Sequence, residues 1–240
     1  MKKYFIVSDV HSYLTLLIEA LDNNAFSLSN DNHVLVVCGD LFDRGLESRE
    51  LYDFVKSIPD NRFIYIRGNH EDLIIDCIDL LVKKEFNHLH HISNKTILTI
   101  SQWTGISPLD LVNNNFDEVA LKEVLKPYIK LIDKSINYFE IGDYVFVHGW
   151  IPTNENWRNA SDLEWERARW LNGMKEAACG NTLKNKIIVC GHYYTDWGRE
   201  HILKSTIKEN NYGIYKNKGI IAIDTTTAIS KKINVLIVEN

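Results

Sequence analysis

Short apolar runs rich in β-branched and aromatic residues recur along this sequence and predict its strands. Most of the runs are uninterrupted rather than alternating, which is typical of strands covered on both faces. A Gly142-Asp143 turn joins two of them into a predicted hairpin. The predicted strands occupy residues 4–7, 34–38, 62–67, 138–141, 144–147, 187–190, 219–224 and 233–238.

Segments with apolar residues at helical spacing alternate with these runs. They predict helices over residues 13–21, 48–57, 73–82, 118–132 and 163–174. The alternation favours an α/β or α+β fold, and a length of 240 residues suits a single domain, residues 1–240. Residues 72–135 form a predicted, mostly helical insertion or cap within that domain, with turns at 101–105 and 107–108.

Three histidines lie inside the predicted insertion: His88, His90 and His91. One interpretation is a second metal site. We favour a solvated polar loop, because the nearby sequence offers no acid or cysteine at ligand spacing.

Composition narrows the range of partners. The chain is 45% hydrophobic and 25% charged, and its net charge of −5 comes without a basic block, which argues against nucleic acid as the main partner. Two of the four cysteines, Cys38 and Cys190, lie inside apolar runs, and the chain has no Cys-x-x-Cys pair. This pattern fits a reducing compartment. We expect a cytoplasmic protein without a membrane partner, because no apolar segment reaches the ~18 residues of a membrane span. The oligomeric state is not readable.

Side chains that bind metals or transfer protons follow the predicted strands at their carboxyl ends, where α/β sheets form ligand crevices. Two carboxylates, one carboxamide and three imidazoles make a mixed oxygen and nitrogen set that suits Mn, Fe or Zn. Asp9 and His11 are two residues apart, so an extended backbone would point them the same way. The candidate ligands are Asp9, His11, Asp40, Asn69, His148 and His192.

Six ligands are too many for one ion and suit two ions that share a carboxylate. Asp40 is the natural bridge, because it follows the most enclosed apolar run. Two metal ions ~3.5–4 Å apart clamp the oxygens of an in-line phosphoryl displacement and lower the pKa of a bridging water.

Other polar residues beside the ligands extend this chemistry. His70 adjoins Asn69 and is placed to protonate a leaving alkoxide, with Asp43 orienting its ring. Arg44 and Arg67 are placed to hold phosphate oxygens through their planar guanidinium groups.

The order Asp-x-His, Gly-Asp-x-x-Asp-Arg-Gly, Gly-Asn-His-Glu, His and Gly-His resembles the calcineurin-like metallophosphoesterase superfamily. Residues 43–45 and 67–71 are most similar to serine/threonine phosphoprotein phosphatases of the bacterial and bacteriophage type. The resemblance spans residues 4–192 with gaps and does not cover the helical insertion. It implies a four-layer sandwich, in which two mixed β-sheets pack face to face between outer helices.

The resemblance also implies a role for each site residue. His70 would be the general acid paired with Asp43, and Arg44 would bind phosphate. A later arginine also binds the substrate phosphate in this family, and we favour Arg169 over Arg167. Asp9 and His11 would hold the first metal, Asp40 would bridge, and Asn69, His148 and His192 would hold the second.

The activity implied is hydrolysis of phosphoserine or phosphothreonine by direct attack of a water or hydroxide that bridges two divalent ions. Manganese is the expected metal, with iron and zinc open, and the substrate would be a phosphoprotein or a small phosphoester. The alternative is a dinucleoside polyphosphate hydrolase of the diadenosine tetraphosphate type, a group that typically lacks the Asp-Arg-Gly and Gly-Asn-His-Glu combination. A third reading, a catalytically inactive scaffold, conflicts with the intact ligand set.

Four departures and undecided positions remain. Tyr193 and Tyr194 follow Gly191-His192 where many phosphodiesterases of the superfamily have a second histidine two residues on, which favours the phosphatase-type site. Ser12 replaces a common glycine. Trp150 would line the cleft or belong to the core, and Asp224 would support a ligand histidine or cap a turn.

Overall fold

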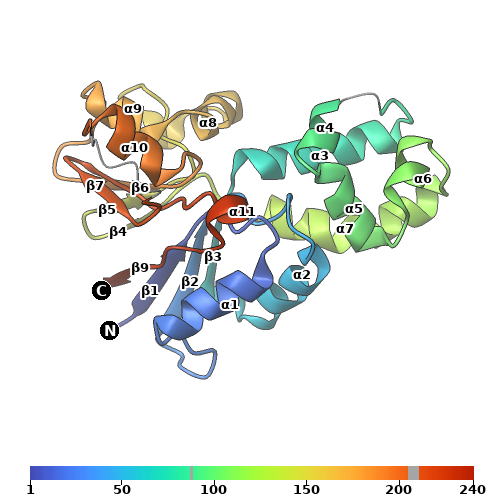
Figure 1. Ribbon diagram of the computed structural model, residues 1–240, viewed down its shortest axis with the longest axis horizontal. Coiled ribbons are helices and arrows are strands. Elements are labelled where there is room, and N and C mark those ends of the chain that lie inside the picture. Colours follow the sequence, from blue (N-terminus) through green and yellow to red (C-terminus); the bar gives the residue numbers. More distant parts are fainter. Residues whose placement is uncertain (87–88, 205–210) are drawn as a thin grey trace.

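Two mixed β-sheets form the centre of the computed structural model, which describes residues 1–86, 89–204 and 211–240 (Figure 1). The first sheet has the order β3-β2-β1-β9 and the second β4-β5-β6-β8-β7. Their bounds are β1 Lys3–Val7, β2 His33–Cys38, β3 Phe63–Ile66, β4 Phe139–Ile141, β5 Tyr144–Phe146, β6 Ile187–Cys190, β7 Tyr215–Asn217, β8 Ile220–Ala222 and β9 Leu236–Glu239. The predicted strands are confirmed, and β7 is an addition to them.

Helices flank both sheets, some on their outer faces and others in a lobe to one side (Figure 1). They are α1 Leu14–Asn23, α2 Ser48–Ser57, α3 Asn69–Val82, α4 Leu89–Ser93, α5 Thr96–Thr104, α6 Pro108–Val112, α7 Glu118–Asp133, α8 Asp162–Arg169, α9 Gly173–Ala178, α10 Thr195–His201 and α11 Thr227–Ser230. Two predictions were wrong in detail. The turn expected at 101–105 is the end of α5, and the helix expected at 163–174 breaks because Asn172 accepts a bond from the Lys175 N–H and starts α9.

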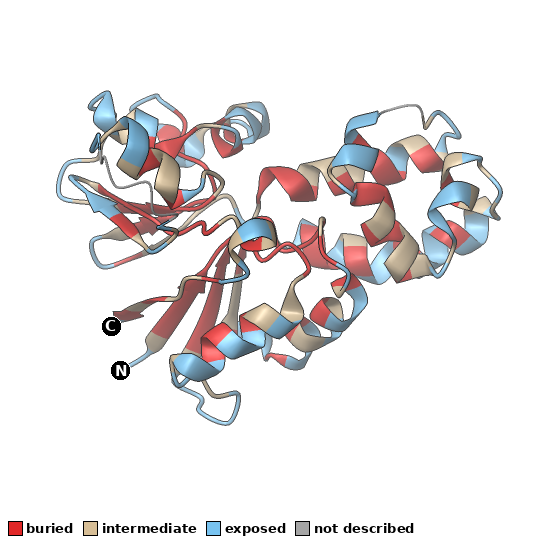
Figure 2. Cartoon of the chain, in the orientation of Figure 1, coloured by how far each residue is buried: buried red, intermediate tan, exposed pale blue. Residues whose placement is uncertain are grey.

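Successive side chains of a strand point to opposite faces of its sheet, and this alternation divides the apolar residues into layers. In β1, Phe5 and Val7 pack against the outer helices, whereas Tyr4 and Ile6 face the second sheet. Strands β2, β5 and β6 divide in the same way, so one apolar cluster lies between the sheets and one lies on each outer side. Accordingly, β1 and β2 are largely buried (Figure 2). The four-layer sandwich is therefore confirmed, and the uninterrupted apolar runs reflect burial on both faces.

Parallel pairing brings the ligand-bearing ends together. β1 pairs with β2 and β2 with β3 in parallel, with Val7 opposite Val37 and Cys38 opposite Ile66. In the second sheet β5, β6 and β8 are also parallel. The two C-terminal strands belong to different sheets, because β8 lies beside β6 while β9 pairs antiparallel with β1.

The helical insertion shares a core with the first sheet. Trp103 of α5 is buried, lies edge-on to Phe42 and stacks on Tyr128 of α7 with ring centroids 4.4 Å apart. The helices α3 to α7 form the lobe on the right of Figure 1. The first turn of α3 also reaches the strand ends, so this lobe contributes directly to the site described below.

The histidines of the insertion differ from the expected solvated loop. His90 and His91 lie on α4, where His90 is exposed and His91 is completely buried. His88 lies outside the described residues.

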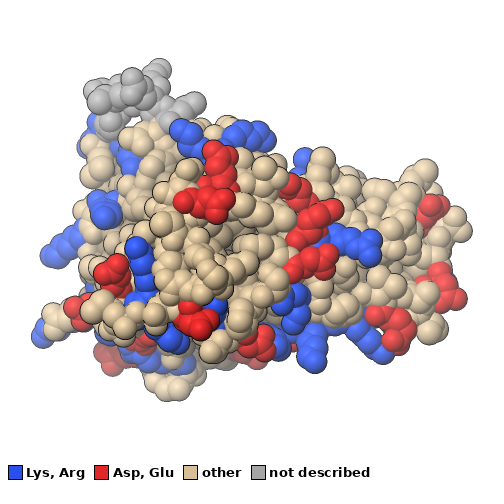
Figure 3. All heavy atoms as spheres, turned by 90° about the horizontal axis from the view of Figure 1, so that it is seen from below, with Lys and Arg blue, Asp and Glu red and all other residues tan. Residues whose placement is uncertain are grey.

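Two surface properties bear on partners. Among the described residues no helix combines the length and the apolar character needed to cross a bilayer. On the face shown in Figure 3, lysines and arginines lie among aspartates and glutamates rather than in one block.

Candidate metal centre

Tight turns, not extended backbone, bring the first ligands together. Asp9 and His11 both have φ of 51°, and Asp40 has φ of 53°, in the left-handed region that non-glycine residues seldom adopt. The expectation that Asp9 and His11 converge through an extended segment was therefore wrong, although His11 Nε2 does lie 4.0 Å from Asp9 Oδ1. Backbone strain of this kind is typical of functional sites.

Asp40 lies between two groups of candidate ligands. One group is His11, Asp40 and His70, and the other is Asp40, His148 and His192; within each, the ligand atoms lie within 4.8 Å of one another. Asp40 Oδ2 is 3.7 Å from His11 Nε2, and Oδ1 is 3.3 Å from His148 Nε2. A carboxylate with one oxygen in each group has the geometry of a bridge between two ions.

The hydrogen bonds of His148 show why this centre suits a cation. Its Nδ1 lies 2.9 Å from the Cys38 carbonyl and donates to it, which leaves Nε2 as an acceptor in the neutral ring. That Nε2 lies 2.8 Å from Asn69 Oδ1, which is also an acceptor. Two buried lone pairs face each other, an arrangement that a metal ion between them satisfies.

His11 repeats this arrangement in the other group. Its Nδ1 donates to the Phe42 carbonyl at 3.0 Å, so its Nε2 turns towards the carboxylates of Asp9 and Asp40. A backbone carbonyl behind each ring fixes the tautomer and orients the metal-binding nitrogen, as is common for metal-bound histidines.

The pKa values favour the same conclusion. Burial lowers the pKa of His11 well below its usual value and that of His192 to about 2, so both rings are neutral and able to bind metal. Burial raises the pKa of Asp9 to about 6 and also raises that of Asp40. His11 and His192 add no positive charge beside these buried carboxylates, and two divalent cations would supply it.

Glu71 is a functional residue that sequence reasoning missed. Its buried carboxylate accepts the backbone N–H of Asp40 at 2.9 Å, of Leu41 at 3.0 Å and of Gly68 at 2.7 Å. Glu71 thereby connects two loops, the one that carries Asp40 and the one that carries Asn69. The signal was present in the sequence, because a glutamate three residues after Gly68 occupies the N3 position of a helix, where it can reach back to the N-cap.

His70 and Asp43 are in contact, as the sequence suggested. His70 Nδ1 lies 2.8 Å from Asp43 Oδ2, which also accepts from Thr96 of the insertion at 2.8 Å. Burial lowers the pKa of His70, but the Asp40 charge and the hydrogen bond to Asp43 outweigh it and raise the pKa to about 8. Arg44 Nη2 lies 3.2 Å from His70 Nε2.

A pocket of about 380 Å³ opens onto the metal centre. The guanidinium group of Arg44 lies in the wall of this pocket. The aromatic side chains of Trp170 and Tyr194 also line it and are 49% and 40% exposed. Trp150 is buried in the core, and Asp224 accepts the Thr226 N–H and so caps a turn beside the pocket. The described residues that line the pocket are Asp9, His11, Asp40, Arg44, Asn69, His70, Asn94, Trp170, His192, Tyr193, Tyr194, Asp224 and Thr226.

Arg67 and Arg169, both predicted to bind phosphate, form ion pairs with the same carboxylate, that of Asp72. Arg67 Nε donates to Asp72 Oδ1 at 2.6 Å, and Arg169 Nη1 donates to Asp72 Oδ2 at 2.8 Å. Arg169 also donates to Asn137 at 2.7 Å. Neither arginine is among the described residues that line the pocket, and Arg167 is exposed on α8. The structure thus brings Arg44, not Arg67 or Arg169, to the metal centre.

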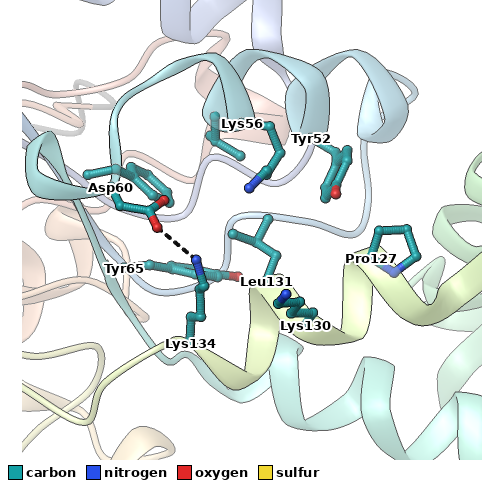
Figure 4. A pocket seen from close by; sticks show the side chains of 10 residues that line it. Tyr52, Lys56, Asp60, Tyr65, Pro127, Lys130, Leu131 and Lys134 are labelled. Atoms are coloured by element: carbon teal, nitrogen blue, oxygen red, sulfur yellow. Dashed lines mark hydrogen bonds and ion pairs between the residues drawn. The ribbon is translucent and has the colours of Figure 1, made fainter.

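A separate hollow lies between α2, β3 and α7 and has a volume of about 370 Å³ (Figure 4). Lys56, Lys130 and Lys134 line it, and Lys134 pairs with Asp60 at 2.9 Å. Within the described ranges this hollow holds no group of metal-capable side chains. The described part of this hollow therefore offers no second metal centre.

Comparisons with known proteins agree with this geometry. Residues 2–220 match the family model described as calcineurin-like phosphoesterase. No curated protein sequence matches the chain.

Solved structures resemble the whole chain at low identity. A protein described as a diadenosine tetraphosphatase has a TM-score of 0.56 at 16% identity, covering 100% of this chain and 95% of that one. The cold-active protein-tyrosine phosphatase of a Shewanella species has a TM-score of 0.55 at 17% identity, with coverage of 100% and 76%. A protein serine/threonine phosphatase from Saccharomyces cerevisiae has a TM-score of 0.51 at 14% identity, with coverage of 92% and 66%. At these identities the likeness shows the fold.

Proposed function

The chain belongs to the calcineurin-like phosphoesterase family, and from this premise we propose that it is a dinuclear-metal phosphomonoesterase that hydrolyses phosphoserine or phosphothreonine. The observation that carries the proposal is the position of Asp40, which has one oxygen towards His11 and the other towards His148. The buried His70–Asp43 pair lies directly beside it.

Two divalent ions would bind on either side of Asp40, and we expect manganese. The bound ions would supply charge for the phosphate oxygens and lower the pKa of the attacking water. Asp9 and His11 would hold the first ion, Asp40 would be shared, and Asn69, His148 and His192 would hold the second.

The remaining residues would position the phosphate and move a proton. Asp43 holds the His70 ring by its Nδ1, which leaves Nε2 directed towards Arg44 and the pocket. From that position Nε2 would protonate the departing alkoxide. The Arg44 guanidinium would hold two phosphate oxygens in its planar fork.

A dinucleoside polyphosphate hydrolase is the second candidate, and the exposed aromatic side chains at the pocket favour it. Trp170 lies edge-on to His192 with ring centroids 5.9 Å apart, and Tyr193 and Tyr194 also line this pocket. Exposed rings next to a phosphate site would stack on a nucleobase.

Release of phosphate from a phosphothreonine peptide and turnover of diadenosine tetraphosphate distinguish the two. Both would be measured with Mn²⁺ and with chelator, and phosphotyrosine peptide would be the third substrate. We expect turnover of the phosphothreonine peptide that disappears with chelator. Preference for the dinucleotide would replace the first proposal by the second, and equal rates with and without chelator would contradict both.

The two arginine environments lead to opposite expectations for alanine variants. Arg44→Ala should raise the KM for p-nitrophenyl phosphate by about 10–100-fold, because a hydrogen bond to a charged group contributes about 1.5–3 kcal/mol. Arg169→Ala should leave KM near the wild-type value but lower the melting temperature, because it leaves Asp72 with Arg67 alone. Steady-state kinetics and thermal unfolding of both variants test this, with the exposed Arg167→Ala as control. A raised KM in Arg169→Ala at unchanged stability would restore it as a phosphate ligand.

A further inference from the structure

A second cluster of metal-capable side chains lies in the helical insertion, outside the pocket of the metal centre. Asp76 projects from α3, and His90 and His91 project from α4. One ligand atom from each of the three side chains lies within 4.8 Å of the others. The sequence did not reveal this cluster, because the acid comes from the preceding helix.

The contacts within the cluster bring nitrogen and oxygen donors together. His91 is completely buried, and its Nε2 lies 3.0 Å from Asp76 Oδ2. The rings of His90 and His91 have centroids 4.0 Å apart at an interplanar angle of 40°. Two donor atoms bound to the same tetrahedral ion, each at about 2.0–2.1 Å, lie about 3.3 Å apart. The distance between His91 Nε2 and Asp76 Oδ2 is close to this value.

We propose that Asp76, His90 and His91 bind a third divalent cation, of which zinc is the best match. Two imidazoles and one carboxylate are ligands that zinc prefers, and water would complete a tetrahedral set. Asp76 is more than half exposed, so the ion can enter from solvent.

The position of the cluster gives the ion a structural role near the reaction. Asp76 follows His70 by six residues on α3, which is a rise of about 9 Å. The His90 carbonyl accepts from Asn94 Nδ2 at 3.0 Å, and Asn94 lines the catalytic pocket. Thr96, two residues further, binds Asp43. An ion that joins α4 to α3 therefore fixes one wall of the pocket without touching the substrate.

The test counts bound zinc in the full-length protein after equilibrium dialysis, by elemental analysis. His90→Ala and Asp76→Asn should each lower the zinc content by one equivalent relative to wild type. Asp79→Asn is the matched control, since Asp79 is an exposed acid on the same helix that pairs with Lys83, and it should leave the content unchanged. The test avoids replacing His91, because its side chain is completely buried and its loss would disturb packing.

The same measurement in an Asp40→Asn background separates this site from the catalytic ions. Adding His90→Ala should remove one further equivalent there, and zinc should raise the melting temperature of Asp40→Asn but not of the double variant. A zinc content that His90→Ala leaves unchanged in both backgrounds would reduce the cluster to an ion pair between Asp76 and His91 and overturn the proposal. This result does not depend on which substrate the enzyme hydrolyses.

Discussion

Asparagine at position 40 is expected to remove the metal ions and, with them, turnover. The Asp40 carboxylate is shared by both ligand groups, with Oδ2 towards His11 and Oδ1 towards His148. The amide carries no charge and offers one oxygen, so it can no longer bridge the two groups. We expect kcat to fall at least about 10³-fold, because the ions supply several kcal/mol of transition-state stabilisation. Metal content and phosphate release, measured on the same preparation, check this.

His70→Asn is the matched variant for Asp40→Asn. It should keep both ions and lower kcat by about 10²–10⁴-fold, the contribution typical of a general acid. The difference follows from orientation, because His70 Nδ1 faces Asp43 and its Nε2 faces Arg44. His70 also lies in one of the ligand groups, with Nε2 3.9 Å from Asp40 Oδ2. Equal metal loss in the two variants would make His70 a ligand and refute the assigned roles.

Glu71→Ala is expected to destabilise the protein by about 3–5 kcal/mol and to weaken metal binding at the same time. The substitution leaves three backbone N–H groups without their acceptor in a buried site, namely those of Asp40, Leu41 and Gly68. It also frees the turn that holds Asp40 in the left-handed conformation. Chemical denaturation of the metal-free protein measures the first effect, and metal titration measures the second.

Glu71→Gln and Asp79→Asn complete this experiment. Glutamine keeps the volume of Glu71 but directs an NH₂ group at backbone donors, so it should recover only part of the stability. Asp79→Asn makes the same chemical change at an exposed position of α3 and should change the free energy of unfolding by less than about 0.5 kcal/mol. Wild-type stability in Glu71→Ala would show that the loop holds Asp40 without this carboxylate.

Much of the fold was predictable because burial on both faces leaves a plain signal. Uninterrupted apolar runs such as residues 34–38 correspond to strands between two apolar clusters. The sequence did not show which sheet each strand joins. The runs at 219–224 and 233–238 look alike, yet one pairs with β6 and the other with β1, since pairing depends on contacts far apart in the chain.

The candidate site was predictable as a set of residues but not as a set of contacts. Metal-binding side chains after strands suggested Asp40 and His192 without showing the left-handed turns that orient them. Arg169 illustrates the limit. The family resemblance suggested that it binds phosphate, whereas in the folded protein its partner is Asp72, which lies 97 positions earlier in the chain. The role of an arginine near an active site therefore depends on which side chains it pairs with in the folded protein.

The antiparallel pairing of β9 with β1 places a demand on synthesis. Lys3 of the first strand lies opposite Glu239, and Tyr4 opposite Val238. Until β9 leaves the ribosome, the outer edge of β1 has no partner, and an exposed apolar edge is prone to pair with other chains. At about 5–20 residues per second, this exposure lasts for roughly ten seconds to most of a minute. The nascent chain is therefore open to pairing with other chains at this edge throughout that interval.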